Sequence, residues 1–425
     1  MSTSKELREE KRAHKKAYKK AKRKAVGLWK GLTIFFCILS ILMMPVAMIA
    51  GMFDNTFAII TGDKFWELEN EDPSAVYYSG DYATTEERLT AGNEVVYQTE
   101  AEAATLLMNK NNALPLAQGS KISLFSTSSV NVVYGGTGSG NVDASLSDNL
   151  KQAAQKSGLV VNETLWNFYA EGEGSEYVRV NGGMWPWSPT TALGEAPWSA
   201  YTDEVKQSFN EYGDAAVVVL SRIGGEGYDL EHTKFNYLAL SQEEKDMLDW
   251  AATMKANGTI KSIIVLINTS NALQVDFLKE NPYTVDACLW IGGVGISGTN
   301  AVTDILAGKV NPSGSLVDTY CYDNLSSPAM HNYLALEYAN FNGQVPDQAS
   351  TYMVYQEGIY VGHKYYETRY FDAVMGRGNA GDYASQYGKE VAFTFGHGLS
   401  YTTFEYSNMT VTEGVNENGE KCYNV

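Results

Sequence analysis

Four short apolar runs most strongly constrain the fold of this 425-residue chain. Their length and continuous apolar character predict β-strands, and the second run suits a parallel strand that is covered on both faces. The runs occupy residues 121–126 (KISLFS), 214–221 (DAAVVVLS), 261–268 (KSIIVLIN) and 284–291 (TVDACLWI).

Helical stretches alternate with these strands. Ser241 and Glu244 have the spacing of a capping box and predict one helix start. Strand–helix alternation predicts an α/β fold: a layered α/β/α sandwich with a mainly parallel sheet. Ligands on such sheets bind beyond the carboxyl ends of the strands. The predicted helices cover residues 143–156, 200–212, 241–256, 272–280 and 297–307.

The loops that follow the strands therefore fall on one edge of the sheet. Neither long glycine-rich loop predicts a nucleotide site, because no P-loop Lys-Ser/Thr follows the first and no ribose-binding acid follows the last. A tight turn that admits close backbone approach explains their glycines. The loops read 134–140 (YGGTGSG), 222–229 (RIGGEGYD), 269–270 (TS) and 292–298 (GGVGISG).

Glu226 is the best catalytic candidate among the residues of these loops. Glycines flank it on both sides, so its carboxyl group can project at the sheet edge. Arg222, Asp229 and His232 are near enough in sequence to shift its pKa in opposite directions. A general acid needs such a tuned pKa. On these features alone, however, an exposed turn glutamate explains the residue better.

Other chemistries find less support. No G-x-S-x-G elbow joins a strand to a helix in the required place, and the chain has five histidines. Its four cysteines are far apart and form no metal-ligand pattern, so we expect no metal, no organic cofactor and no disulfide framework. Asp and Glu outnumber Lys and Arg by 50 to 32, which argues against nucleic-acid binding. Plentiful Tyr and Trp suit sugar stacking.

The N-terminal region predicts a membrane anchor. Residues 32–53 are uncharged and long enough to span a bilayer as a helix. Twelve Lys and Arg against three Glu in residues 1–30 place the N-terminus in the cytoplasm and the rest of the chain outside the cell. A cleaved signal peptide is the rival interpretation, but the basic region is unusually long for one. We expect residues 31–53 to contact the lipid bilayer.

Composition divides the rest of the chain. The alternating pattern EYSNMTVT at 405–412 indicates the first strand of a β domain that the chain does not complete. The predicted division is a basic cytoplasmic tail at 1–30, a transmembrane helix at 31–53, a polar stalk at 54–95, the α/β sandwich at 96–404 and the start of a β domain at 405–425.

Six motifs, in order along the chain, resemble those of glycoside hydrolase family 3. They span residues 102–116, 134–140, 221–229, 305–315, 355–367 and 395–404. The resemblance implies that the β domain is fibronectin-type-III-like. It also implies an active site shared by two domains, in which a (β/α)8 barrel supplies an aspartate nucleophile and the sandwich supplies the general acid/base.

The family's acid/base glutamate falls on Glu226 of this chain. The resemblance thus reverses the preference for an exposed turn glutamate. It implies supporting or substrate-binding roles for Arg222, Tyr228, Asp229 and His232. The implied activity is retaining, exo-acting hydrolysis of terminal β-linked sugars, with an oligosaccharide or β-glucoside as substrate. Sugar, linkage and oligomeric state stay open.

The chain departs from the family in one respect. The usual order is barrel, sandwich and β domain, but here no barrel precedes the sandwich. The one Asp-Trp pair, Asp249-Trp250, lies in a predicted helix and does not resemble the nucleophile motif. Some members have a reversed order, so we expect a barrel to follow in a longer parent protein. The alternative is a non-catalytic, surface-anchored carbohydrate-binding module with Trp185, Trp187 and Trp198 as stacking platforms.

Overall fold

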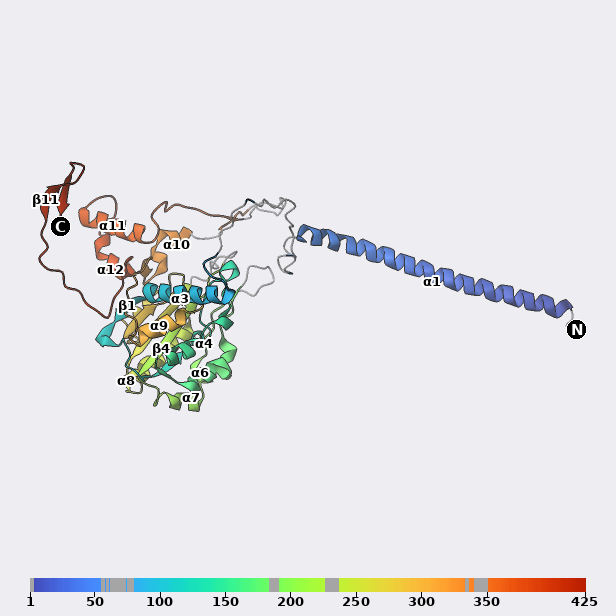
Figure 1. Cartoon of the computed structure of the whole chain (residues 1–425), viewed down its shortest axis with the longest axis horizontal. Helices are drawn as coiled ribbons and strands as arrows, with labels where there is room; N and C mark the ends of the chain where they lie inside the picture. The colour runs from blue at the N-terminus through green and yellow to red at the C-terminus, as the bar shows by residue number, and fades with distance from the viewer. Residues whose placement is uncertain are drawn as a thin grey trace. The chain divides into compact units, whose positions relative to one another are not determined.

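The structure is a computed structural model with two compact units, Met1–Asp81 and Tyr82–Val425. The first unit contains α1 (Ser4–Met52), one continuous helix that includes Pro45 (Figure 1). Among the described residues, one helix is long and apolar enough to cross a membrane by length and composition, and it is this one. The described residues are 4–54, 58, 61, 74, 80–182, 191–225, 237–332, 336–339 and 351–425.

The second unit is built on a six-stranded sheet of order β1-β6-β5-β4-β2-β3. All neighbours pair in parallel except β1, which runs antiparallel to β6 at one edge. The four predicted strands are confirmed as β2, β4, β5 and β6. The strands are β1 (Thr105–Asn109), β2 (Lys121–Phe125), β3 (Val160–Val161), β4 (Ala215–Arg222), β5 (Ile263–Thr269) and β6 (Ala287–Trp290).

Helices cover both faces of this sheet, which confirms the predicted layered α/β fold (Figure 1). Every residue of β4 is buried, because Val218 and its alternate neighbours face one core while Val217 and its alternate neighbours face the other. Helices α7 and α8 contribute to the first core, α5 and α9 to the second, and α6 to both. Their bounds are α5 (Leu150–Lys156), α6 (Glu163–Ala170), α7 (Asp203–Ser208), α8 (Gln242–Ala256) and α9 (Gly298–Leu306).

Three predicted helices are shorter than expected. Those expected at 143–156 and 200–212 contract to α5 and α7, and 272–280 holds only a 3₁₀ turn, Asp276–Leu278. In that last segment Leu273 and Val275 are fully buried, and the Val275 amide donates to the carbonyl of Cys321. Tertiary contacts therefore override the local helix propensity there.

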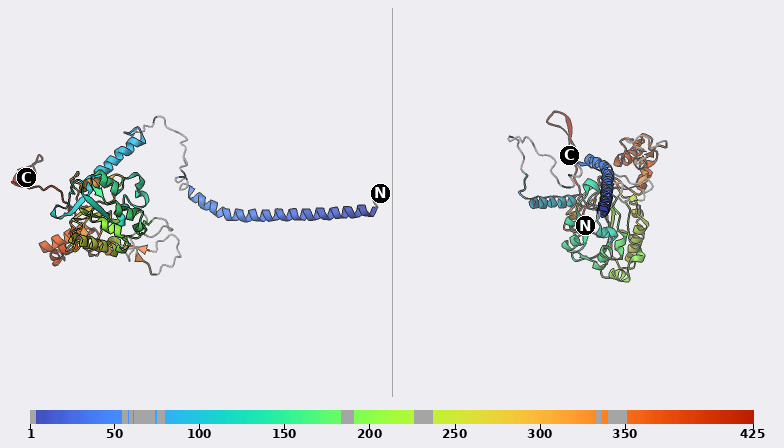
Figure 2. Two further views of the ribbon diagram at one scale, coloured as in Figure 1. Left: turned by 90° about the horizontal axis from the view of Figure 1, so that it is seen from below. Right: turned by 90° about the vertical axis from the view of Figure 1, so that its right-hand side faces the viewer.

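Helix α3 (Thr85–Ala103) begins ten residues before the predicted end of the stalk at 95. A capping box of Thr84 and Glu87 starts it in a polar segment whose first turns are exposed, so no apolar pattern marks it. Farther along, the Tyr97 hydroxyl donates to Asp304 of α9 at 2.9 Å. The helix extends outward from the sandwich at its N-terminal end (Figure 2).

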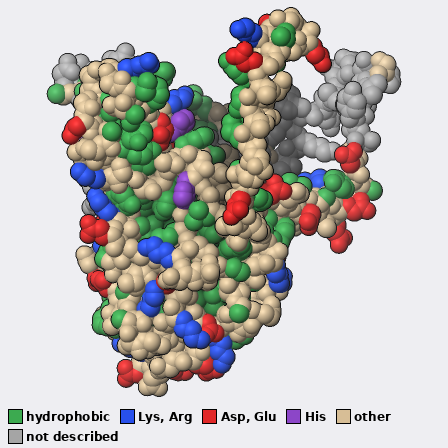
Figure 3. Space-filling model, turned by 90° about the vertical axis from the view of Figure 1, so that its left-hand side faces the viewer, with side chains coloured by type: hydrophobic (Ala, Val, Ile, Leu, Met, Phe, Trp, Pro, Cys, Tyr) green, Lys and Arg blue, Asp and Glu red, His purple; other side chains and the backbone are tan. Residues whose placement is uncertain are grey.

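The remaining elements follow α9 in the chain, apart from the short α4. Of the strand expected at 405–412, only Thr412 lies in a strand, at the start of a hairpin. On the face in Figure 3, Lys and Arg side chains are interspersed with Asp and Glu. The elements are α4 (Thr127–Val130), β7 (Tyr320–Cys321), η8 (Asn324–Ser326), α10 (Pro328–Asn332), β8 (Leu336–Glu337), β9 (Thr351–Tyr352), α11 (His363–Met375), α12 (Tyr387–Glu390), β10 (Val391–Phe393), β11 (Thr412–Val415) and β12 (Lys421–Asn424).

Glu100 of α3 predicts a pH-dependent stability. It is 8 % exposed, lies against Gly298 of α9, and its Oε1 has no hydrogen-bond partner in the described part of the chain. Burial raises its pKa from 4.5 to about 8. The folded state therefore holds more protons than the unfolded state between these values, and the free energy of unfolding falls as pH rises through this window.

We expect Glu100→Gln to make this fall smaller by at most a few kcal/mol, since one pKa unit corresponds to about 1.4 kcal/mol. Burial also raises the pKa of Glu195 to about 8, and its contribution stays the same in both proteins. Denaturant melts of the detergent-solubilised chain at pH 5 and pH 9 measure the difference. Glu102→Gln, on the exposed side of α3, is the matched control. An unchanged pH dependence in Glu100→Gln would show that other groups cause the fall.

Candidate active site

One buried amide joins the loops at the carboxyl edge of the sheet. Asn268, in β5, donates through Nδ2 to the carbonyls of Val133 at 3.0 Å and Gly292 at 2.7 Å. Its Oδ1 accepts from the Val133 amide at 2.6 Å and the Ser221 hydroxyl at 2.7 Å. The side chain thus connects β4 and β5 with the loops after β2 and β6. The prediction that these loops share one edge is confirmed.

The glycine-rich loop after β2 contacts the loop after β4 directly. The Thr137 amide donates to the Gly224 carbonyl at 3.0 Å, and Thr137 forms a parallel bridge with Gly225. A Cβ atom on Gly136 would lie 3.3 Å from that same carbonyl, closer than side chains usually come. The glycines therefore permit close backbone approach, and the backbone just before Glu226 is fixed.

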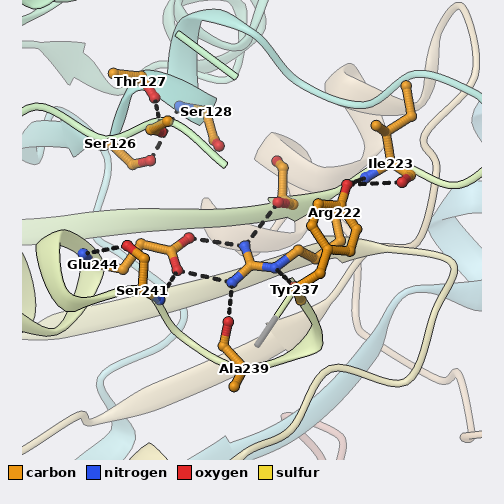
Figure 4. A network of polar contacts seen from close by, with 11 residues as sticks. Ser126, Thr127, Ser128, Arg222, Ile223, Tyr237, Ala239, Ser241 and Glu244 are labelled. Atoms are coloured by element: carbon orange, nitrogen blue, oxygen red, sulfur yellow. Dashed lines mark hydrogen bonds and ion pairs between the residues drawn. The ribbon is translucent and has the colours of Figure 1, made fainter. Parts of the chain in front are cut away.

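Arg222 ends β4 and is completely buried (Figure 4). Two of its nitrogens donate to both carboxylate oxygens of Glu244, each at 2.8 Å. The guanidinium also donates to the carbonyls of Ser221, Tyr237 and Ala239. With a charged partner and three carbonyls, its hydrogen-bonding capacity is satisfied, as a buried charge requires.

Glu244 has a second role at the start of α8. Its carboxylate accepts from the Ser241 amide at 2.8 Å, and the Ser241 hydroxyl accepts from the Glu244 amide at 3.1 Å. The capping box predicted from sequence is therefore confirmed. The same carboxylate fixes the start of α8 and binds the guanidinium at the end of β4, so the two elements are held together.

Tyr237 adds to these contacts, and we call Arg222, Glu244 and Tyr237 together the clamp. Its hydroxyl accepts from the Ile223 amide at 2.9 Å and donates to the Ile223 carbonyl at 2.8 Å. Together with the Arg222 contacts, these bonds hold residues 222 and 223 beside residues 237–239. The chain between them is the segment that carries Glu226.

The predicted site residues Glu226, Tyr228, Asp229 and His232 lie outside the described residues. Arg222 is the predicted site residue that the structure describes, and its charge is paired with Glu244. What the structure establishes is the position of both ends of the segment, at the carboxyl edge of the sheet.

Sequence reasoning missed two buried ionisable groups near this clamp. Arg179 donates to Asn181 and to the Asn131 carbonyl, but its Nη1 has no partner in the described part of the chain. Burial, with a smaller contribution from the charge of Arg222, lowers its pKa to about 10. Glu195, whose pKa burial raises to about 8, accepts from the amides of Thr127 and Ala196. No periodic pattern or motif marks either residue.

Trp198 does not offer a free stacking face. Its ring stacks on Trp250 at 4.5 Å between centroids and packs against Tyr201 at 4.8 Å, with Lys206 5.2 Å from its centroid. It belongs to an aromatic cluster over α7 and α8. Trp185 and Trp187, the other two suggested platforms, lie outside the described residues.

The described ranges contain no group of three His, Cys, Asp or Glu side chains that could hold a metal ion. The cysteines Cys37, Cys288, Cys321 and Cys422 are free. The side chains gathered at the sheet edge are instead amides, hydroxyls and one ion pair.

The glycosyl hydrolase family 3 C-terminal domain matches residues 104–363. The chain belongs to this family. Among similar proteins, β-glucosidase A of Butyrivibrio fibrisolvens is 27% identical, over 75% of this chain and 36% of that protein. The structure of β-glucosidase 3B from Thermotoga neapolitana in complex with α-D-glucose shares 30% identity with a TM-score of 0.57, covering 76% of this chain and 40% of that one.

A β-glucosidase structure from Paenibacillus barengoltzii has a TM-score of 0.59 at 26% identity and covers 76% of this chain but 31% of that one. The chain thus spans between 31% and 40% of the length of these three relatives. The family 3 C-terminal domain accounts for the sandwich and all four loops at its carboxyl edge. Helices α1 and α3 both precede the matched range, and the final hairpin follows it.

The clamp predicts that two buried arginines contribute very differently to the free energy of unfolding. Arg222→Met leaves Glu244 as an unpaired buried charge, so we expect the free energy of unfolding to fall by about 3–5 kcal/mol. Among the described residues Arg179 has no carboxylate partner, so Arg179→Met should change the free energy of unfolding by no more than about 1 kcal/mol. Urea unfolding followed by tryptophan fluorescence measures both.

A double variant tests the cause. Adding Glu244→Gln to Arg222→Met removes the unpaired charge but keeps a residue that completes the capping box, so part of the lost stability should return. Equal losses in Arg222→Met and Arg179→Met would contradict the central role of the ion pair.

Proposed function

We propose that this chain is the acid/base-bearing part of a retaining β-glucosidase-like hydrolase. Glu226 protonates the leaving glycosidic oxygen and then activates a water molecule. The observation that carries the proposal is the clamped stem of Arg222, Glu244 and Tyr237. It holds the start of the RIGGEGYD segment of a family 3 domain, Arg222 and Ile223, at the carboxyl edge of the sheet, where ligands bind in α/β folds.

Tyr228, Asp229 and His232 contact the substrate or Glu226 in this proposal, and Arg222 holds the stem. The proposal places the aspartate nucleophile in a barrel domain outside these residues, with the two carboxyl groups about 5–5.5 Å apart as retention requires. The named β-glucosidases are far longer than the region they share with this chain, which leaves room for such a domain. The substrate is an oligosaccharide or β-glucoside.

The proposal also includes a membrane anchor. Residues 31–53 cross the bilayer, with the basic residues 1–30 in the cytoplasm and the sandwich outside the cell. The exposed apolar surface of α1 supports this, because such a surface is stable in lipid and costly in water.

Activity measurements test the role of Glu226. The matching region of the Butyrivibrio β-glucosidase A is replaced by residues 82–425, so that a nucleophile is present. We expect Glu226→Gln to lower kcat on 4-nitrophenyl β-glucoside by at least 10²-fold, and azide to restore turnover of a dinitrophenyl glucoside, whose leaving group needs no acid.

Glu231→Gln, in the same segment, is the matched control and should keep most of the activity. Wild-type rates in Glu226→Gln would exclude the acid/base role. Turnover of the aryl glucoside by the 425-residue chain alone would contradict the division of the site between two domains.

Membrane extraction tests the anchor. We expect the native protein to resist alkaline carbonate extraction and its intact mass to include residues 1–53. A carbonate-soluble protein that lacks these residues would identify the segment as a cleaved signal peptide.

A further inference from the structure

A cavity of about 770 Å³ with both polar and apolar lining residues lies in the C-terminal part of the second unit. Its volume is in the range of small-molecule sites, roughly 300–1,000 Å³. We call it the α11 pocket and define it by Asn332, Glu357, Tyr360, Tyr365, Arg369 and Asp372, which line it. None of its lining residues belongs to the loops at the carboxyl edge of the sheet.

One face of α11 forms a wall of this pocket. Tyr365, Thr368, Arg369 and Asp372 all line the cavity, and their spacing of three, four and seven residues places them on one side of the helix. Tyr366, the next residue after Tyr365, is buried in a small core with Cys321 and Tyr383. The helix thus packs through a different side and presents polar groups to the cavity.

Arg369 is held in place by two contacts, and some of its N–H groups have no hydrogen-bond partner among the described residues. Its Nη1 donates to the Tyr365 hydroxyl at 2.7 Å, and the guanidinium carbon lies 4.0 Å from the centroid of the Tyr383 ring. Within the described residues, Nε and Nη2 have no hydrogen-bond partner, and no carboxylate lies within ion-pair distance. The aromatic contact orients the charge without neutralising it.

Some carboxylate oxygens that line the pocket also have no hydrogen-bond partner among the described residues. One oxygen of Glu357 accepts from the Asn332 amide at 2.6 Å. Its other oxygen, and both side-chain oxygens of Asp372, have no partner among the residues that the structure covers. Unpaired carboxylate oxygens beside unpaired guanidinium nitrogens form a site with both donors and acceptors.

Tyr360 adds an aromatic surface. It is 47% exposed, and its ring makes no contact with an aromatic or cationic side chain of the described residues. A half-exposed aromatic ring beside hydrogen-bonding groups suits a ligand with one apolar face and polar edges. Trp198, by contrast, has its faces covered.

We propose that the α11 pocket binds a neutral saccharide. Hydroxyl groups of a sugar donate to Glu357 and Asp372 and accept from Arg369 and Asn332, while the C–H face of its ring packs on Tyr360. Two carboxylates against one guanidinium disfavour an anion, and an apolar ligand would leave these charged groups without hydrogen-bond partners. Binding here requires neither Glu226 nor a nucleophile, so it does not rest on the proposed hydrolysis.

Titration calorimetry on the full chain tests this proposal. The chain carries Glu226→Gln to prevent turnover and is held in a detergent without a sugar headgroup, because a glycoside detergent would compete. Cellobiose and xylobiose are the probes, and sodium sulfate tests for an anion site. We expect at least one disaccharide to bind, and Tyr360→Ala and Asp372→Asn each to weaken that binding by tenfold or more.

Tyr355→Ala is the matched control, since Tyr355 is exposed in the same segment and does not line the pocket. It should bind as the parent does. A thermal melt verifies that each variant folds, which the exposure of Tyr360 makes the expected result. Binding of sulfate alone, binding of neither disaccharide, or equal binding by Tyr360→Ala and Tyr355→Ala would each overturn the proposal.

Discussion

The candidate active site depends on the buried ion pair between Arg222 and Glu244. Removing two charges from water is costly, and the pair persists because three carbonyls and the capping box of α8 satisfy the remaining groups. Its consequence is geometric: the end of β4, the start of α8 and the chain near Tyr237 are held together. Arg222 therefore helps to fix the chain at Ile223 and at Tyr237, on either side of residues 226–236.

A second polar contact organises the rest of that edge. Asn268 connects three strand ends through one side chain, and the glycines after β2 let the backbone reach Gly224. The edge is thus rigid where the loops begin, which suits a catalytic group that must be positioned accurately. The α11 pocket lies on other elements and has the opposite character, with unpaired donors and acceptors beside an exposed ring.

Much of the fold could be predicted because burial leaves a pattern. The run at 214–221 must be covered on both faces, and that requirement already implies helices on each side of a parallel sheet. Helix α3 could not be predicted in this way, because its exposed first turns carry no apolar stripe. The prediction of a helix at 272–280 was wrong for the opposite reason. Its apolar residues suggested a helix, but the hydrogen bond from the Val275 amide to the Cys321 carbonyl holds the segment in another conformation.

The sequence by itself determined the order of strands and helices, the edge at which the loops meet, the capping box at Ser241 and the choice of Glu226 through its family motif. Only the tertiary structure showed that Glu244 is the partner of Arg222, that Arg179 and Glu195 are buried nearby, and that Trp198 is covered by Trp250. The physical reason is the separation along the sequence of the residues that interact. Hydrophobic period and capping act over a few residues, whereas these contacts join side chains that only the folded chain brings together.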